Sequence, residues 1–158
     1  MSLTPEIPTA RSSRSILTRS PVWQVGVLAS VAAAIVTELF ALGARAINIP
    51  MEAGSFGAAA AAPIPIGGFA VGTLMWSIVG TVLAVVLARR AKRPARTFVV
   101  TTVVLTVLSL AGPALAVHTT TATKVVLALS HLVAAAVVIP TLALRLSHVR
   151  ASSGADVD

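Results

Sequence analysis

Four long apolar runs, almost free of charged residues, dominate this sequence. They cover residues 22–44, 66–88, 97–117 and 125–144. About 20 apolar residues, at a rise of about 1.5 Å per residue in a helix, span the hydrocarbon core of a bilayer. Hydrophobic residues make up 56% of the chain and charged residues only 11%, which is more apolar than one soluble core requires. The sequence therefore predicts an all-α integral membrane protein built as a four-helix bundle.

The segments outside the runs predict one membrane domain, residues 21–146, between two tails. Residues 1–20 are rich in Ser, Thr, Pro and Arg and lack apolar periodicity, so we expect a disordered cytoplasmic tail. We expect the same of residues 147–158. A cleaved signal peptide is the alternative for the N-terminal region. Its apolar part should be roughly 7 to 15 residues long, whereas the run 22–44 is longer and contains Glu38, which favours an uncleaved first span.

The distribution of Lys and Arg predicts the orientation of the bundle. Four spans place residues 1–20, the loop RRAKRPAR and the C-terminal segment on one side, and this side carries all but two of the 12 basic residues, Arg45 and Lys124. Cytoplasmic loops are enriched in Lys and Arg. We therefore expect an up-down-up-down bundle in the cell membrane with both termini in the cytoplasm. The five basic residues of the loop are expected to face anionic lipid headgroups; they are Arg89, Arg90, Lys92, Arg93 and Arg96.

The segment 46–65 is the only sizeable external element of this topology. Its proline, glycine and alanine content predicts an irregular cap over the end of the bundle rather than a strand. The alanine run 58–62 is expected to form one helical turn lying on the membrane.

Composition excludes several classes of function. The chain has no Cys, so it has no disulfide, thiolate nucleophile or Cys-ligated metal. Its basic residues lie at helix ends rather than on a folded basic face with interleaved aromatic residues, which argues against nucleic acid. It has no paired carboxylates, nucleophile motif or glycine-rich phosphate loop, so we expect no enzyme and no cofactor. His118 fits an interfacial residue, because nothing supplies further ligands for a metal shared with His131.

Three stretches carry a family resemblance. PIPIGGFAVGTLMWSIVG, RRAKRPARTFVVTTVVLTVLSLAGP and TATKVVLALSHLVAAAVVIP resemble an uncharacterised family of small four-helix membrane proteins from high-GC actinobacteria, over roughly residues 22–146. The resemblance implies a fold, a membrane location and a bacterial type. It implies no activity.

Small and hydroxyl residues predict how the helices pack, because apolar surface alone does not drive helices together in lipid. In the second span small residues recur every four positions, and Trp76 lies on the same stripe. In the third span hydroxyl residues precede Pro113, which is expected to kink the outer end of the helix. The residues assigned to helix packing are Gly68, Gly72, Gly80, Ser77 and Ser109.

Glu38 and His131 are the ionisable residues inside the runs. Glu38 shares a seven-residue spacing with Arg45, and His131 shares one with Lys124, so each pair lies on one helix face. Both residues lie roughly 10 Å below the outer helix ends. An outward-facing polar site with a direct bond between the two side chains is one interpretation. The other is structural: a buried pair that fixes helix register, or a neutral Glu38 bonded to a hydroxyl.

The function expected from these residues is that of a non-enzymatic accessory or interaction subunit, in a homo-oligomer or a larger membrane complex. The alternative is a small oligomeric transporter or channel for a proton or small solute. Proton transfer needs relay groups across the whole membrane, but between His131 and Arg145 the fourth run has no ionisable residue. This dry cytoplasmic half favours the accessory subunit.

Overall fold

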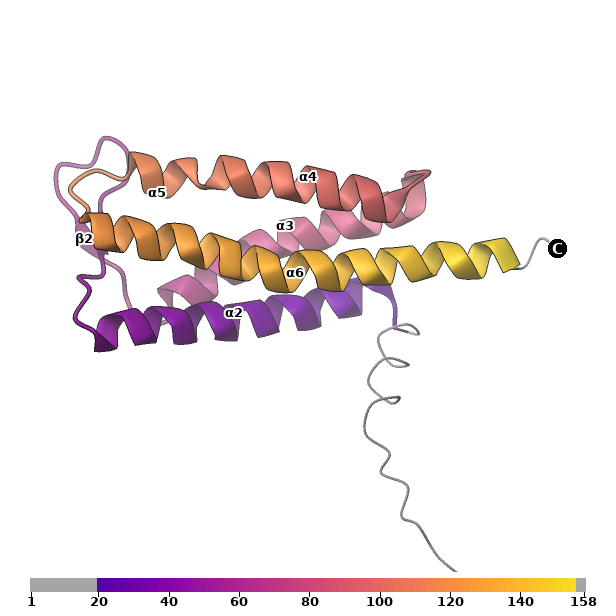
Figure 1. Cartoon of the computed structure of the whole chain (residues 1–158), viewed down its shortest axis with the longest axis horizontal. Coiled ribbons are helices and arrows are strands. Elements are labelled where there is room, and N and C mark those ends of the chain that lie inside the picture. Colours follow the sequence, from indigo (N-terminus) through magenta and orange to yellow (C-terminus); the bar gives the residue numbers. More distant parts are fainter. Residues whose placement is uncertain (1–19, 156–158) are drawn as a thin grey trace, which may run out of the picture.

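The computed structural model describes residues 20–155, and helices form most of this part of the chain (Figure 1). They are α2 (Val22–Ala46), α3 (Gly68–Arg90), α4 (Pro94–Ser109), α5 (Ala111–Leu115) and α6 (Thr121–Ala155). Four helical stretches are long and apolar enough to cross a membrane, with α4 and α5 together forming the third. The predicted all-helical class and its four apolar helices are confirmed at this level.

Prolines and glycines set several of the helix boundaries. α2 starts directly after Pro21, which has extended backbone angles. α3 starts after Gly67, whose φ of 88° is the left-handed conformation that glycine adopts without strain. α4 starts with Pro94, at a position where the missing N–H costs no helical hydrogen bond.

Pro113 accounts for the break between α4 and α5. A proline cannot donate to the carbonyl four residues before it, and for Pro113 that residue is Ser109, where α4 ends. Within the last turn of α4, the Ser109 hydroxyl donates to the Thr106 carbonyl at 2.7 Å. The predicted distortion near the end of the third span is therefore confirmed, and it takes the form of two helices separated by Leu110.

α6 is longer than the sequence predicted. The helix continues through the internal Pro140 and runs to Ala155, so the prediction of a disordered tail from residue 147 is wrong for residues 147–155. The Thr141 hydroxyl donates to the Val137 carbonyl at 2.7 Å, next to the carbonyl that Pro140 leaves without its helical donor. Residues 156–158, and the predicted tail at 1–19, lie outside the described part of the chain.

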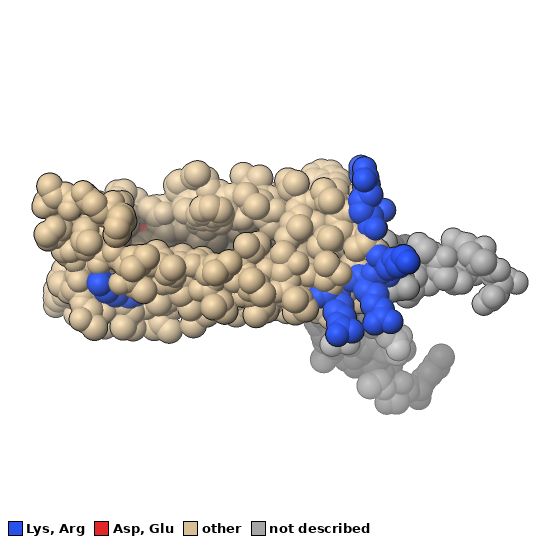
Figure 2. Space-filling model, turned by 90° about the horizontal axis from the view of Figure 1, so that it is seen from above, with Lys and Arg blue, Asp and Glu red and all other residues tan. Residues whose placement is uncertain are grey.

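α2 is the most buried of the four apolar helices, and it packs against both α3 and α6. α4 packs mainly against α6. We call the end of the bundle that carries the α3–α4 loop the basic end, and the opposite end the hairpin end (Figures 1 and 2). An apolar cluster at the basic end joins all four helices. Its buried members are Val25, Ala84, Phe98, Leu142 and Leu146.

The hairpin end is covered by the segment between α2 and α3. Two short strands, β1 (Glu52–Ala53) and β2 (Ala62–Pro63), pair antiparallel there. Gly54 and Val117 exchange two backbone hydrogen bonds of 3.1 Å, which connect this segment to the loop between α5 and α6. The segment does lie at the end of the bundle, but the prediction that it contains no strand is wrong. The alanines at 58–61 form no helical turn, and Ala62 belongs to β2.

Candidate functional site

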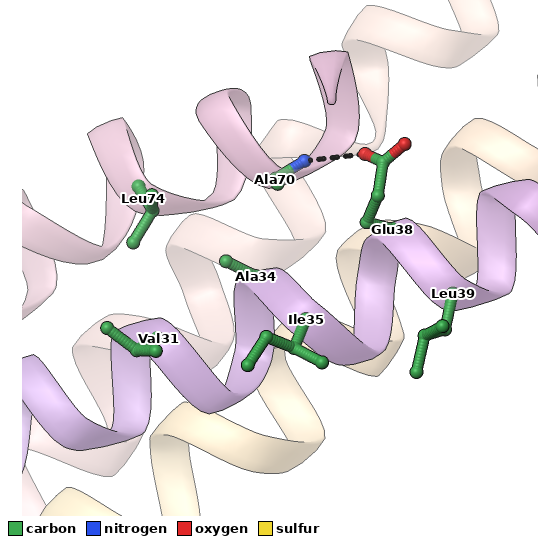
Figure 3. Close-up of a pocket in the computed structure, with 7 residues that line it drawn as sticks. All are labelled: Val31, Ala34, Ile35, Glu38, Leu39, Ala70 and Leu74. Carbon is green, nitrogen blue, oxygen red and sulfur yellow. Dashed lines mark hydrogen bonds between the residues drawn. The ribbon is translucent and has the colours of Figure 1, made fainter. Parts of the chain in front are cut away.

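Glu38 lies on the face of α2 that meets the start of α3. One carboxylate oxygen, Oε1, accepts a hydrogen bond from the Gly67 N–H at 2.8 Å. The other, Oε2, accepts one from the Ala70 N–H at 3.1 Å (Figure 3). Both acceptor atoms of this intramembrane acid are therefore bound to backbone donors of the neighbouring helix.

The start of α3 explains why these donors are free. The first four N–H groups of a helix have no acceptor within it, and a side chain at the N-cap normally supplies one. Here the N-cap is Gly67, which has no such side chain. The Glu38 side chain supplies the missing acceptors. Its single carboxylate accepts from the N–H of the N-cap residue, Gly67, and from the N–H of Ala70, three residues later. In a capping box these two bonds come from two side chains of the same helix.

Arg45, two turns further along α2, binds the segment just before α3. Its Nη2 atom donates to the carbonyls of Ile64 at 2.9 Å and Pro65 at 3.2 Å. Its Nε atom is buried and has no acceptor in the described part of the chain. The stripe that the seven-residue spacing predicted is real, but it faces α3. Glu38 holds backbone donors and Arg45 holds backbone acceptors of one short segment, residues 64–70.

His131 is bound to its own helix rather than to Glu38. Its Nδ1 atom lies 2.6 Å from the Leu127 carbonyl oxygen. Since a carbonyl oxygen only accepts, Nδ1 carries the proton in this bond. Among residues 20–155 no hydrogen bond or ion pair joins Glu38 to His131. The predicted direct bond is therefore replaced by two separate contacts with backbone atoms. The physical reason is that the start of α3 offers unpaired N–H donors to the carboxylate.

The glycine that lies tightly against another helix is not one of the predicted stripe. A Cβ atom added at Gly72 or Gly80 would meet no atom of a neighbour within 4 Å, and Trp76 between them is 76% exposed. Within residues 20–155 these two glycines do not pack against another helix, which corrects the prediction. At Gly68 the nearest atoms to an added Cβ belong to Ile64 and Pro65, in the segment just before α3.

Gly26 of α2, which the sequence analysis did not select, makes the close contact instead. A Cβ atom at Gly26 would lie 2.3 Å from Cγ2 of Thr81 on α3. Nearer the hairpin end, the Thr37 and Thr73 hydroxyls form a bond of 3.0 Å between the same helices. The signal available in the sequence was a glycine in the first half of α2, opposite the hydroxyl residues Thr73, Ser77 and Thr81 of α3. Of the two predicted packing serines, Ser77 is buried, whereas Ser109 bonds within its own helix.

A groove between α2 and α3 runs from Glu38 toward the basic end. Its volume is ≈ 380 Å³ and its exposed lining is apolar. Figure 3 shows Val31, Ala34 and Leu74 along it, with Glu38 at one end turned toward Ala70. Because the carboxylate oxygens are engaged by backbone N–H groups, the groove presents hydrocarbon and no acid.

The predicted headgroup residues gather at the basic end. Figure 2 shows most of the blue Lys and Arg side chains clustered there, with a smaller blue group near the hairpin end. All five residues of the predicted set are exposed. They occupy the last turn of α3, the connecting loop and the first turn of α4; they are Arg89, Arg90, Lys92, Arg93 and Arg96.

Four long apolar helices, with polar side chains bound to backbone groups between and within them, define a small multi-pass membrane protein. Residues 17–148 match the Family of unknown function (DUF6069), and the chain belongs to that family. This confirms the resemblance to an uncharacterised family. No curated protein and no solved structure matches the chain.

Proposed function

We propose that this protein is a non-enzymatic accessory or interaction subunit of the membrane. One observation carries the proposal: its intramembrane polar side chains hold the protein's own backbone in place. Glu38 binds two N–H groups at the start of α3, Arg45 binds carbonyls of the preceding segment, and His131 binds a carbonyl of α6. A group that works on a substrate needs free donors or acceptors, whereas these bonds stabilise one arrangement of helices.

The apolar cluster at the basic end supports this proposal against the transporter alternative. Val25, Phe98 and Leu142 are almost completely buried there, and they pack between all four helices. A proton or ion path through the bundle needs polar groups or water at every depth. A dry cluster of side chains at one end of the bundle opposes such a path within a single copy.

We further propose that the chain is an up-down-up-down bundle in the bacterial plasma membrane, with both termini in the cytoplasm. The concentration of Lys and Arg at the basic end supports this orientation. The resemblance of the sequence supports an actinobacterial source. In this orientation the five basic residues of the α3–α4 region meet the anionic headgroups of the cytoplasmic leaflet.

Single cysteines test the orientation without background, because the natural chain has none. Ser55→Cys places a thiol at the hairpin end and Ala91→Cys places one at the basic end. In intact cells a membrane-impermeant maleimide should label the first and spare the second until the cells are opened. Labelling of Ala91→Cys in intact cells would overturn the topology.

Flux and association measurements test the function. The purified protein is placed in vesicles that contain a pH-sensitive dye. We expect protons to enter these vesicles no faster than they enter empty vesicles or vesicles with the Glu38→Gln protein. In the native membrane, a photo-crosslinker in place of the exposed Trp76 should give one discrete adduct, identifiable as a second copy or another subunit. A crosslinker in place of exposed Leu144 on α6 is the matched control. Proton flux that Glu38→Gln abolishes would favour the transporter and contradict the proposal.

A further inference from the structure

A cavity opens at the basic end between the first turn of α4 and α6. Its volume is ≈ 250 Å³, and it shares no lining residue with the groove between α2 and α3. Since a water molecule takes roughly 30 Å³ in the liquid, the cavity has room for a phosphate group and the carbon atoms bonded to it. The lining residues are Arg93, Pro94, Ala95, Arg96, Leu146 and Ser147.

The charge at this cavity is uncompensated within the described residues. Arg93 and Arg96 are both exposed, and neither forms an ion pair in residues 20–155. The carboxylates of this part of the chain belong to Glu38 and Glu52. Glu38 is bound to the start of α3, and Glu52 lies in β1, so both are at the hairpin end. The two guanidinium groups therefore face the cavity with no negative group of the described chain beside them.

The backbone adds to this positive potential. The first turn of α4 contains no acidic residue and receives no side-chain cap. Basic side chains near a helix N-terminus are repelled by the helix dipole, whereas an anion there is stabilised. In α3 the corresponding groups are bound by the Glu38 carboxylate. In α4 the positive charge of Arg93 and Arg96 adds to the partial positive charge of the helix N-terminus. An anion bound beside them would therefore stabilise the two arginines and the helix end.

We propose that this cavity binds the phosphate group of an anionic phospholipid. The inference rests on the proposed membrane location, which places the ends of α4 and α6 at the level of the headgroups. Two guanidinium groups suit a phosphate because each presents a planar fork of donors to its oxygens. The site differs from general attraction of basic residues to the membrane surface, because it assigns lipid selectivity to two of the five residues of the α3–α4 region.

The test compares two double variants with equal loss of charge. Arg93→Gln/Arg96→Gln empties the cavity of guanidinium groups, and Arg89→Gln/Arg90→Gln removes two exposed charges that do not line it. The full-length proteins are placed in nanodiscs of phosphatidylcholine with increasing phosphatidylglycerol. Native mass spectrometry then counts the anionic lipid that each protein retains, and thermal unfolding reports whether each variant is folded.

We expect the cavity variant to retain phosphatidylglycerol about tenfold more weakly than the control variant, because bonds to charged groups are lost in addition to surface attraction. Arg96→Lys, which keeps the charge but not the fork, should fall between the natural protein and the cavity variant. Equal losses in the two double variants would overturn the proposal. Inorganic phosphate added to pure phosphatidylcholine nanodiscs distinguishes a free anion from a lipid headgroup as the ligand. If millimolar phosphate raises thermal stability as much as phosphatidylglycerol does, the site binds a free anion and the lipid proposal is overturned. Since retention does not depend on flux or on a partner, this result stands apart from the test of the proposed function.

Discussion

Glu38 of α2 and Ala70 of α3 are joined by a hydrogen bond of 3.1 Å from the backbone N–H to the carboxylate. With the bond from Gly67 at 2.8 Å, it makes one side chain the cap of a helix to which it does not belong. The acid that the sequence places inside an apolar span is therefore a part of the α2–α3 contact.

Removing the acceptors of Glu38 should weaken the bundle. We expect Glu38→Ala to lower the free energy of unfolding by about 1–3 kcal/mol, because two partly buried N–H groups lose their acceptor. Glu38→Gln keeps one carbonyl acceptor and should cost less. Reversible unfolding in mixed micelles measures both. The control is Glu52→Gln, an exposed acid of β1; a loss for Glu38→Ala no larger than for this control would refute the capping role.

Two glycines separate close packing from open surface. At Gly26 an added Cβ would lie 2.3 Å from Thr81, whereas at Gly72 it would meet nothing within 4 Å. We expect Gly26→Ala to destabilise by about 1–3 kcal/mol through overpacking. Gly72→Ala should leave stability unchanged or raise it by up to about 1 kcal/mol, since alanine favours the helix. Thermal unfolding in detergent compares the two, and the reverse order would contradict the packing described.

The separate contacts of Glu38 and His131 predict additive substitutions. In a double-mutant cycle of Glu38→Gln and His131→Ala, we expect the two losses to add to within about 0.5 kcal/mol, because the residues share no partner. The free energies of the four proteins give the coupling directly. A coupling well above this value would show that the two side chains act as one site.

Arg45 should control how tightly the start of α3 is held. Arg45→Met removes the donors to the Ile64 and Pro65 carbonyls. We expect hydrogen exchange of the amides in residues 64–70 to increase, by about fivefold for a loss of about 1 kcal/mol. Lys124→Met is the matched control, because the Lys124 Nζ atom makes only a 3.4 Å contact with the Ala114 carbonyl. Equal exchange in both variants would contradict the role of Arg45.

The sequence predicted the helices well because span length and apolar content are local properties. The four runs correspond to the apolar helices, and Pro113 marks the break at Ser109 because the missing donor can be counted along the chain. The continuation of α6 to Ala155 was missed, since a polar composition at the end of a span does not by itself stop a helix.

The partners of the polar residues could not be predicted in the same way. A seven-residue spacing puts Glu38 and Arg45 on one face of α2, but it does not say which neighbour that face meets. His131 at a similar depth was the obvious partner among side chains, whereas the structure uses backbone N–H groups, which every sequence contains. Likewise, the stripe of Gly72 and Gly80 defines a face of α3 but not what lies against it.

The cap that Glu38 provides also sets an order for assembly in the membrane. The Gly67 and Ala70 N–H groups find their acceptor only in the Glu38 carboxylate, and in hydrocarbon N–H groups without an acceptor cost several kcal/mol. α2 precedes α3 in the chain, so we expect the second span to be most stable in lipid when the first already lies beside it. The first two helices are thus best inserted as a pair, and the acid in the first span prepares the place that the second one takes.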